Sequence, residues 1–276
     1  MPTKNQICYL VLETCYKSSA KSAFVQIKAN CVICLYCSMK RQSLTIVLPC
    51  YNPDANWHIN IKQQLVEILP QISNDPIEIL VINDGSKLAI DKEFSLLKAS
   101  FPNCKLLSYA INKGKGYAIR EGVKNATGDI IIYTDIDFPY TVQSFLTMVH
   151  QLENHDLIIG TRDDSYFHHI PKTRAFISRG LKFLIKKTFK LPTSDTQGGL
   201  KGFRKSLQPV FLKTGINRYL FDLEFIYLAA KQNYNIGIYP IELRQETIVR
   251  KTNLKVIFKE FMNLFQLLIR SKFGGS

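Results

Sequence analysis

The sequence lacks the long apolar segments, secretion signals and paired cysteines that would place a chain in a membrane or outside the cell. No run of 18 or more apolar residues occurs among its 276 residues, so no membrane-spanning helix is expected. The first residues show no basic start followed by a clean apolar stretch, so no signal peptide is predicted. The seven cysteines are an odd number, which indicates a reducing compartment.

Acidic residues are also scarce, because 36 lysines and arginines outnumber 22 aspartates and glutamates and leave a net charge of +14. Such an excess indicates an anionic partner, which could be nucleic acid, an anionic membrane surface or a phosphorylated substrate. The stretch 165–194 contains no acid at all, and apolar residues recur at helical spacing between its basic residues. This pattern predicts a basic amphipathic helix that binds a membrane surface. A core-facing helix with a solvated basic face is one alternative, and a nucleic-acid-binding helix is another.

Residues 1–38 show no sustained apolar period, and we interpret them as an extension outside the folded domain. The spacing Cys31-x-x-Cys34-x-x-Cys37 lacks the second Cys or His pair that a structural zinc site uses. Met39 comes just before the first apolar strand, so we expect that translation can begin there and that the upstream segment is dispensable. The rest is predicted to form one domain over 43–245 and an amphipathic helical tail over 246–276.

Within the predicted domain, strand and helix patterns alternate. Short apolar segments predict strands at 44–49, 77–82, 104–109, 130–133, 157–160 and 236–241. Helical periodicity appears between them at 59–69, 91–100, 114–126 and 142–154. This order predicts an α/β fold with a mostly parallel sheet and helices on both faces.

Two carboxylates follow the strand predicted at 130–133. Asp135 and Asp137 stand at alternate positions after it, and Pro139 prevents any continuation of the strand. In a doubly wound sheet the ligand crevice lies outside the carboxyl ends of the strands. Carboxylate oxygens suit Mg²⁺ or Mn²⁺, so we predict a metal site here, with a solvated loop as the alternative.

Polar turns follow the first two strands as well. Pro49, Tyr51 and Asn52 end the first strand, where the Tyr51 ring can flank a base. Asp84 ends the second, where its carboxylate can accept hydrogen bonds from a base or ribose, and Gly85 allows a sharp turn. An ordinary strand-to-loop turn is the alternative at both places.

Two further sites favour phosphate chemistry. Gly114-Lys115-Gly116 opens a helix, so it can approach phosphate oxygens, or it can serve close helix–sheet packing. It is not a Walker A loop, because no Ser or Thr follows the lysine. Arg162 ends the fifth predicted strand, where its guanidinium can bind phosphate oxygens in a bidentate contact. The alternative is a surface ion pair with Asp163 or Asp164.

These motifs occur in the order found in glycosyltransferase family 2: Ile46-Val47-Leu48-Pro49-Cys50-Tyr51-Asn52, Asn83-Asp84-Gly85-Ser86, Asn112-x-Gly114-Lys115-Gly116 and Asp135-x-Asp137. Over about 43–255 the chain resembles enzymes of the GT-A fold, and among them the dolichyl- or polyprenyl-phosphate sugar synthases. Later segments extend the resemblance, namely Asp195-x-Gln197 before a glycine pair, Gly202-Phe203-Arg204, and Phe221-Asp222-x-Glu224.

The resemblance implies a role for each matching residue. The implied catalytic residues are Asp137, Asp195 and Gln197, and the implied metal ligands are Asp135 and Asp137. The implied donor-binding residues are Pro49, Tyr51, Asn52, Asp84, Gly85, Lys115, Asp135 and Arg250. The implied acceptor-phosphate residues are Arg162, Arg174 and Ser178. The chain departs from the family at Pro139, where relatives often carry Gln, and at the Gly198-Gly199 pair.

The resemblance implies a hexosyltransferase that inverts the anomeric centre while moving a sugar from a nucleotide diphosphate sugar to a polyprenyl phosphate. A phosphate monoester has a second pKa of about 6, so it is largely dianionic at neutral pH and needs no general base. Mg²⁺ or Mn²⁺ would stabilise the leaving diphosphate. We expect a cytoplasmic protein, peripheral on the membrane face, with no nucleic-acid partner.

Two other functions stay open. A saccharide hydroxyl as acceptor would require a base, which Asp195 or Asp222 would supply, although the Gln-x-x-Arg-Trp signature of processive relatives is absent. A non-enzymatic binder would show salt-sensitive binding to nucleic acid and no metal-dependent turnover. A sugar nucleotidyltransferase is a remoter alternative, because the first strand carries no glycine-rich basic loop.

Overall fold

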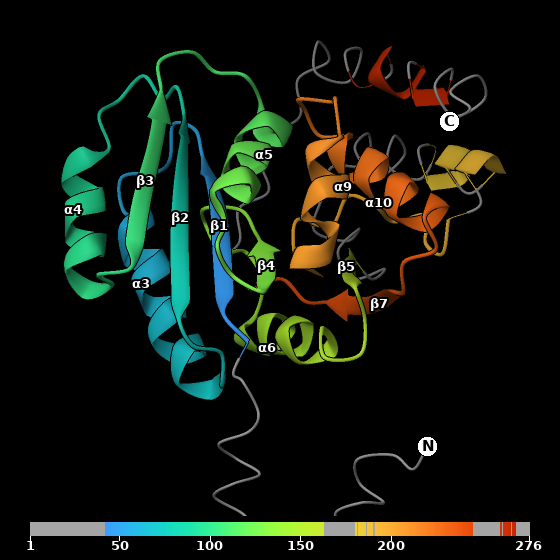
Figure 1. Ribbon diagram of the computed structural model, residues 1–276. Helices are drawn as coiled ribbons and strands as arrows, with labels where there is room; N and C mark the ends of the chain where they lie inside the picture. The colour runs from blue at the N-terminus through green and yellow to red at the C-terminus, as the bar shows by residue number, and fades with distance from the viewer. Residues whose placement is uncertain are drawn as a thin grey trace, which may run out of the picture. The chain divides into compact units, whose positions relative to one another are not determined.

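The apolar segments assemble into one seven-stranded sheet, in a computed structural model that describes residues 42–162, 180, 182–185, 187–189, 191–244, 260, 262–265, 267 and 268. The strands are β1 (Leu44–Cys50), β2 (Ile77–Asp84), β3 (Cys104–Tyr109), β4 (Ile130–Tyr133), β5 (Leu157–Arg162), β6 (Lys201–Arg204) and β7 (Ile236–Ile241). Their spatial order is β3-β2-β1-β4-β6-β5-β7 (Figure 1). Neighbouring strands pair in parallel, except that β6 runs antiparallel to both β4 and β5.

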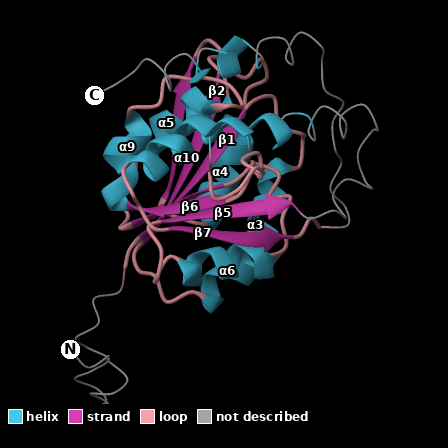
Figure 2. Ribbon diagram, turned by 90° about the vertical axis from the view of Figure 1, so that its right-hand side faces the viewer, coloured by secondary structure: helices cyan, strands magenta, loops and turns pink. Residues whose placement is uncertain are grey.

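Alternate side chains of the central strands point to opposite faces, and each face carries its own helices. Ile46 and Ile132 belong to one buried cluster, and Val47 and Ile131 belong to the other. The first cluster includes side chains of α3 (Trp57–Ile68), α4 (Asp91–Ser100) and α6 (Val142–Gln151). The second includes side chains of α5 (Lys115–Asn125), α9 (Gln208–Leu212) and α10 (Phe221–Lys231) (Figures 1 and 2). The prediction of a mostly parallel sheet covered on both faces is confirmed.

The strand β6 was not predicted from the sequence. It contains four residues, Lys-Gly-Phe-Arg, and a buried lysine beside a glycine gives no alternation of apolar and polar side chains. In the pairing of β6 with β5, Lys201 lies opposite Ile159. The chain therefore leaves the sheet after β5 and returns to it as the strand next to β5. Because β6 is antiparallel, its first residue lies at the edge where the parallel strands end.

Part of the predicted tail and of the basic stretch packs into the domain. The described residues all belong to one compact unit that begins at Gln42. Leu264 and Leu267 are buried in the same cluster as α5, α9 and α10, and so are Ile185 and Phe189. The last two are four residues apart, which is the spacing of one helical face. The described side chains of the basic stretch therefore include a core-facing set, while Phe183 is exposed.

The edge of the sheet opposite the strand ends is tied together by one carboxylate. Glu78, on β2, is buried and accepts hydrogen bonds from the Thr45 hydroxyl at 2.9 Å and from the Thr127 amide and hydroxyl, both at 3.0 Å. It also pairs with Lys105 Nζ at 2.8 Å. Burial raises the pKa of Glu78, but these donors outweigh burial and leave its pKa below the ordinary value of 4.5.

Replacing Glu78 by Gln should destabilise the fold by about 1–3 kcal/mol at pH 7, because the amide cannot accept from all of these donors. Since the folded-state pKa of Glu78 lies below its ordinary value, its stabilisation is present above pH 4.5 and is lost as the pH falls further. Urea unfolding at pH 7 and at lower pH measures the difference, which should shrink in acid.

Glu67, exposed on α3, provides the matched control. Glu67→Gln should change the free energy of unfolding by less than about 0.5 kcal/mol. Equal effects of the two substitutions would contradict a special contribution from Glu78.

Candidate active site

The carboxyl ends of four parallel strands meet at one edge of the sheet. Cys50 aligns with Asn83, Asp84 aligns with Tyr109, and Val47 aligns with Tyr133 in the registers of the neighbouring pairs. The segments that follow β1, β2, β3 and β4 therefore emerge together. They carry most of the residues predicted to bind the donor.

Asp84 organises the loop between β3 and α5. It is 3% exposed, and its carboxylate accepts hydrogen bonds from Asn112 Nδ2 at 2.9 Å, from the Lys113 amide at 2.7 Å and from the Gly114 amide at 2.9 Å. These contacts hold 112–114 beside the end of β2. The structural role of Asp84 is to hold this loop. A contact of Asp84 with a base or ribose stays a prediction, and it would be a second role of the same carboxylate.

Two glycines permit that arrangement. Gly85 has φ +64°, and a Cβ there would lie 2.6 Å from the Asn112 amide nitrogen. Gly114 has φ +107°, and a Cβ there would lie 2.4 Å from the Asn217 carbonyl oxygen. Both the backbone conformation and the lack of space therefore require glycine at these positions.

The N-terminus of α5 packs against the segment before α10. The amides of Gly116 and Tyr117 donate to the Asn217 carbonyl oxygen at 2.9 and 3.2 Å. A Cβ at Gly116 would lie 2.6 Å from the Ile216 carbonyl oxygen. These two amides already have a protein acceptor, so the geometry favours a packing role for this motif over phosphate binding. The helix N-terminus packs against the loop before α10, whereas the sequence predicted packing against the sheet.

The segment after β1 is joined to the segment after β2. The Asn52 amide donates to Ser86 Oγ at 3.0 Å, and the Lys87 amide donates to Asn52 Oδ1 at 2.8 Å. Tyr51 is 44% exposed beside this junction. Its side chain is therefore accessible at this edge, and a contact with a base stays a prediction.

Asp135 and Asp137 lie in a loop that the end of β7 holds. Asp135 is partly exposed, and its Oδ1 pairs with Lys115 Nζ at 2.6 Å. Asp137 is exposed, and its carbonyl oxygen accepts from Arg244 Nη2 at 3.3 Å. The Arg244 amide donates to the Pro139 carbonyl oxygen at 2.9 Å, which fixes the chain after the two carboxylates.

The donor set suits Mg²⁺ or Mn²⁺ bound together with a diphosphate. Two carboxylates two residues apart at a solvent-accessible edge supply hard oxygen ligands, and Mg²⁺ commonly takes one or two carboxylates with substrate phosphates and water. Within the described residues, no group of three or more His, Cys, Asp or Glu side chains could hold a metal by itself. A cation here would therefore depend on ligands from the nucleotide.

A second, buried ion pair lies close to this loop. Lys201 and Asp222 are 0% and 4% exposed, and their Nζ and Oδ1 atoms are 3.1 Å apart. Tyr133 donates its hydroxyl to Asp222 Oδ1 at 2.5 Å, and Lys201 donates to the Gly198 carbonyl oxygen. The pair thereby connects β4, β6 and α10 with the loop before β6.

Burial is the largest influence on the pKa values of both Lys201 and Asp222. Burial lowers the pKa of Lys201, and the Asp222 carboxylate only partly offsets that change. Burial likewise raises the pKa of Asp222 against the opposing effects of Lys201 and Lys115. At Lys115, burial also lowers the pKa, but the carboxylates of Asp135 and Asp222 outweigh it and raise the pKa overall.

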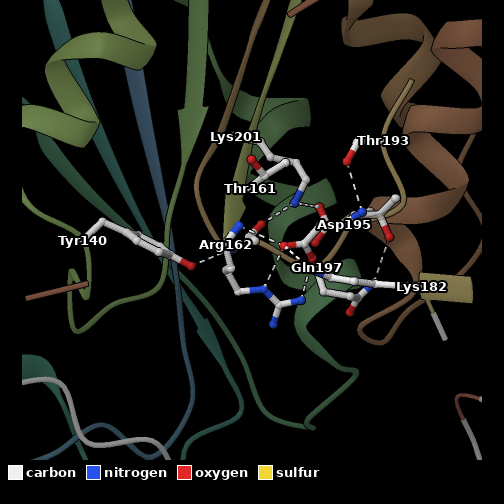
Figure 3. Close-up of polar contacts among 12 residues, drawn as sticks. Tyr140, Thr161, Arg162, Lys182, Thr193, Asp195, Gln197 and Lys201 are labelled. Atoms are coloured by element: carbon white, nitrogen blue, oxygen red, sulfur yellow. Dashed lines mark hydrogen bonds and ion pairs between the residues drawn. The ribbon is translucent and has the colours of Figure 1, made fainter. Parts of the chain in front are cut away.

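Arg162, at the end of β5, is held by Asp195 in a two-pronged ion pair. Its Nη2 lies 2.6 Å from Asp195 Oδ1, its Nε lies 3.3 Å from Oδ2, and its amide donates to Oδ2 at 2.8 Å. Lys182 Nζ lies 3.2 Å from the same Oδ2. Figure 3 shows these side chains close together. The sequence analysis had paired Arg162 with phosphate or with an adjacent aspartate, and the contact with Asp195 spans 33 residues.

The pairing fixes the charge of Asp195. Burial raises the pKa of this carboxyl, but the hydrogen bonds and positive charge of Arg162, together with Lys182, lower it overall. A carboxylate of lowered pKa that two cations already contact is a poor general base. The contacts of Asp195 therefore favour a role in positioning Arg162 and Lys182 over a role in proton abstraction.

The Gly198-Gly199 pair fits between β5 and Asp135. A Cβ at Gly198 would lie 2.0 Å from the Gly160 carbonyl oxygen, and one at Gly199 would lie 2.5 Å from Asp135 Oδ2. The Gly199 amide donates to the Tyr140 hydroxyl at 2.6 Å. The glycine pair, a departure from the family pattern, thus brings the segment of Asp195 and Gln197 against the loop of Asp135.

Some predicted site residues cannot be placed. Arg174, Ser178 and Arg250 lie outside the described residues, as does the extension 1–38. The structure adds Lys201 and Tyr140, which the sequence analysis did not assign to the site. The sequence offered one signal for Lys201, namely a charged residue directly before Gly202-Phe203. Its partner Asp222 lies on α10, far away in the sequence, so the ion pair itself could not be predicted.

Comparison with known proteins identifies the family. Residues 45–210, more than half of the chain, match the model of the family described as Glycosyl transferase family 2. A dolichyl-phosphate beta-glucosyltransferase of Trichomonas vaginalis is 25% identical over 242 residues, which cover 84% of this chain and 75% of that protein. A dolichyl-phosphate beta-glucosyltransferase of Dictyostelium discoideum is 27% identical over 210 residues, which cover 70% of this chain and 64% of that protein.

Solved structures show the same fold. Glucosyl-3-phosphoglycerate synthase from Mycobacterium tuberculosis in complex with Mn²⁺, uridine-diphosphate and phosphoglyceric acid matches with a TM-score of 0.61 and 15% identity, over 83% of this chain and 78% of that one. The same enzyme with Mg²⁺ and uridine-diphosphate matches with a TM-score of 0.59 and 15% identity, over 85% and 80%. At this identity the likeness concerns the fold alone. The sequence resemblance is confirmed, and the chain belongs to glycosyl transferase family 2, has the GT-A fold and is a glycosyltransferase.

Proposed function

We propose that this enzyme transfers a glucosyl group from a nucleotide diphosphate sugar to a polyprenyl phosphate of the dolichyl type, with inversion and with Mg²⁺ or Mn²⁺. The observation that carries the proposal is the cationic cluster of Arg162 and Lys182 around Asp195. Asp195, at the centre of this cluster, lies in the same segment as Gly199, which packs against Asp135. Basic groups suited to an acceptor phosphate thus lie one loop away from carboxylates suited to a donor diphosphate.

The acceptor chemistry agrees with the state of the buried carboxylates. A phosphate monoester is largely dianionic near neutral pH and can attack the anomeric carbon without losing a proton to the enzyme. The two candidate bases for a saccharide hydroxyl, Asp195 and Asp222, are both held in ion pairs. Asp195, whose pKa its cations lower, is a poor base, and Asp222, whose pKa burial raises, is only 4% exposed, so neither carboxylate suits a hydroxyl acceptor well.

On the donor side, Asp135 and Asp137 would hold the cation, which supplies charge stabilisation to the departing nucleotide diphosphate. Lys115, paired with Asp135, adds a positive charge at the same place. Tyr51, exposed beyond β1, offers a ring face to the base. Alignment of donor and acceptor, rather than proton transfer, would then account for most of the rate enhancement.

The names of the relatives direct the choice of first substrates. Two relatives are dolichyl-phosphate beta-glucosyltransferases, and two matching solved structures contain uridine-diphosphate. We therefore take UDP-glucose and a short dolichyl phosphate as the first donor and acceptor to test. The assignment to glucose rests on relatives of 25–27% identity.

A lipid acceptor places the reaction at a membrane surface. In the described part of the chain, no helix combines the length and apolar character needed to cross a bilayer. Phe183 and Lys187 are exposed in the basic stretch, and side chains of this kind suit the interface of an anionic leaflet. Peripheral binding at the cytoplasmic face is part of the proposal.

Replacing Asp137 by Asn should lower transfer of glucose to dolichyl phosphate by about 100-fold or more, because a metal ligand and its charge are lost. Radiolabelled UDP-glucose and chromatography of the lipid product measure the rate with Mn²⁺, with Mg²⁺ and after chelation. Asp91→Asn, at an exposed position on α4, is the control and should leave the rate unchanged. Full activity of Asp137→Asn, or of the chelated enzyme, would refute metal-assisted transfer.

Replacing Arg162 by Lys or Gln should raise the KM for dolichyl phosphate by about tenfold or more, because neither side chain both keeps the two-pronged contact with Asp195 and presents a guanidinium charge to the phosphate. Affinity for UDP with Mn²⁺, measured by calorimetry, should stay within about twofold, since the change lies on the acceptor side. Arg204→Lys, which alters contacts to backbone carbonyl oxygens at the other end of β6, is the control. An unchanged lipid KM would argue against phosphate binding by Arg162.

The pH dependence should follow the acceptor rather than an enzymic base. The value of kcat/KM for dolichyl phosphate should rise through pH about 6, as the second phosphate proton is lost, and level off by about pH 7.5. Asp195, whose lowered pKa keeps it ionised over this range, should add no further inflection. An acidic limb that disappears in Asp195→Asn or Asp222→Asn would instead indicate general-base chemistry.

A further inference from the structure

Lys201 is more deeply buried than its charge alone would favour. It is the first residue of β6, it is 0% exposed, and its ammonium lies 5.8 Å from the centre of the Tyr133 ring. Taking an ion pair out of water costs several kcal/mol, and well-packed apolar residues often serve stability equally well. Stability therefore does not by itself account for a lysine here.

The ammonium of Lys201 contacts two separate parts of the site. It pairs with Asp222 on α10, whose Oδ1 also accepts from the Tyr133 hydroxyl. It donates as well to the carbonyl oxygen of Gly198. Tyr133 ends β4, two residues before Asp135, so one charged group connects the strand before the metal-site loop with the loop before β6.

The Gly198 carbonyl belongs to the dipeptide that supports Asp135. Gly199 lies so close to Asp135 Oδ2 that a methyl group has no room, and its amide is bound to the Tyr140 hydroxyl. The other oxygen of Asp135 faces Lys115. Gly199 and Lys115 thus lie against the two oxygens of Asp135, and Lys201 donates to the carbonyl oxygen of the neighbouring Gly198.

We infer that Lys201 is a positioning residue for glycosyl transfer, which holds the Gly198-Gly199 backbone against Asp135 through its buried ion pair with Asp222. The inference rests on the proposed function only in taking Asp135 as a ligand of the donor metal. Lys201 acts through the glycine pair and touches neither the sugar nor the acceptor. The alternative is that Lys201 only neutralises Asp222.

A double-mutant cycle separates the two explanations. Lys201→Met keeps an unbranched side chain but leaves the Asp222 carboxylate without its partner, so the thermal midpoint should fall. Asp222→Leu should also lower the midpoint, because the ammonium is then uncompensated. The double variant removes both charges, so its thermal midpoint should recover toward that of the wild type.

Binding of Mn²⁺ in the presence of UDP, measured from the free Mn²⁺ signal in electron paramagnetic resonance, is the main readout. If Lys201 positions the glycine pair, the double variant should bind Mn²⁺ about tenfold more weakly despite its recovered stability. Its kcat should fall by about tenfold, with the KM for dolichyl phosphate within about twofold of wild type. A double variant with recovered stability, wild-type Mn²⁺ affinity and wild-type kcat would overturn the inference.

Tyr133→Phe keeps the test decisive if the double variant does not fold. It removes only the hydroxyl that Asp222 accepts, so the thermal midpoint should fall, and Mn²⁺ affinity should fall about threefold because Asp222 then holds Lys201 less firmly. Tyr234→Phe, whose hydroxyl lies 3.5 Å from the Ser206 carbonyl oxygen, is the matched control. Wild-type Mn²⁺ affinity in Tyr133→Phe would count against the inference.

The binding readout needs no lipid, so it separates this inference from the proposed function. A wild-type enzyme that binds Mn²⁺ with UDP but glucosylates no polyprenyl phosphate would refute the acceptor assignment. The cycle would still decide the role of Lys201, because it compares Mn²⁺ affinities alone.

Discussion

Buried carboxylates need partners, and at this site that requirement determines how the loops are held. Asp84, Asp195 and Asp222 are each at most 5% exposed, and each is compensated by a different set of donors. Asp84 collects backbone amides, Asp195 collects Arg162 and Lys182, and Asp222 collects Lys201 and Tyr133. Each carboxylate thereby anchors a separate loop at the carboxyl edge. Asp135 and Asp137, by contrast, are accessible to solvent, as a ligand site requires.

The division between buried and accessible aspartates also orders the chemistry. A carboxylate held by a cation contributes charge and geometry, whereas proton abstraction requires one that can change its protonation state near neutral pH. Asp195, with its lowered pKa, is of the first kind, which supports the proposed acceptor that arrives as an anion. The abundance of basic residues and the dianionic character of a lipid phosphate are consistent with the same conclusion.

Much of the fold could be predicted because local patterns determine it. The apolar strands at 104–109, 130–133 and 236–241 and the helix at 91–100 have the predicted bounds. β6 could not be predicted, because its lysine is satisfied by Asp222, which lies on α10. At the site, the motif order identified the strand ends, but the Arg162–Asp195 pair joins residues distant in sequence. Long-range pairing of this kind depends on sheet order, which periodicity does not reveal.

The reversed direction of β6 has a consequence for how such enzymes can diversify. Because β6 begins opposite Ile159, three residues before β5 ends, and runs antiparallel to β5, the intervening segment begins and ends at the same edge of the sheet. Its length is therefore not constrained by the spacing between strands, as a crossover connection would be. A change in its length leaves the strand register as it is. The fold thus contains one connection that can vary separately from the order and pairing of the strands.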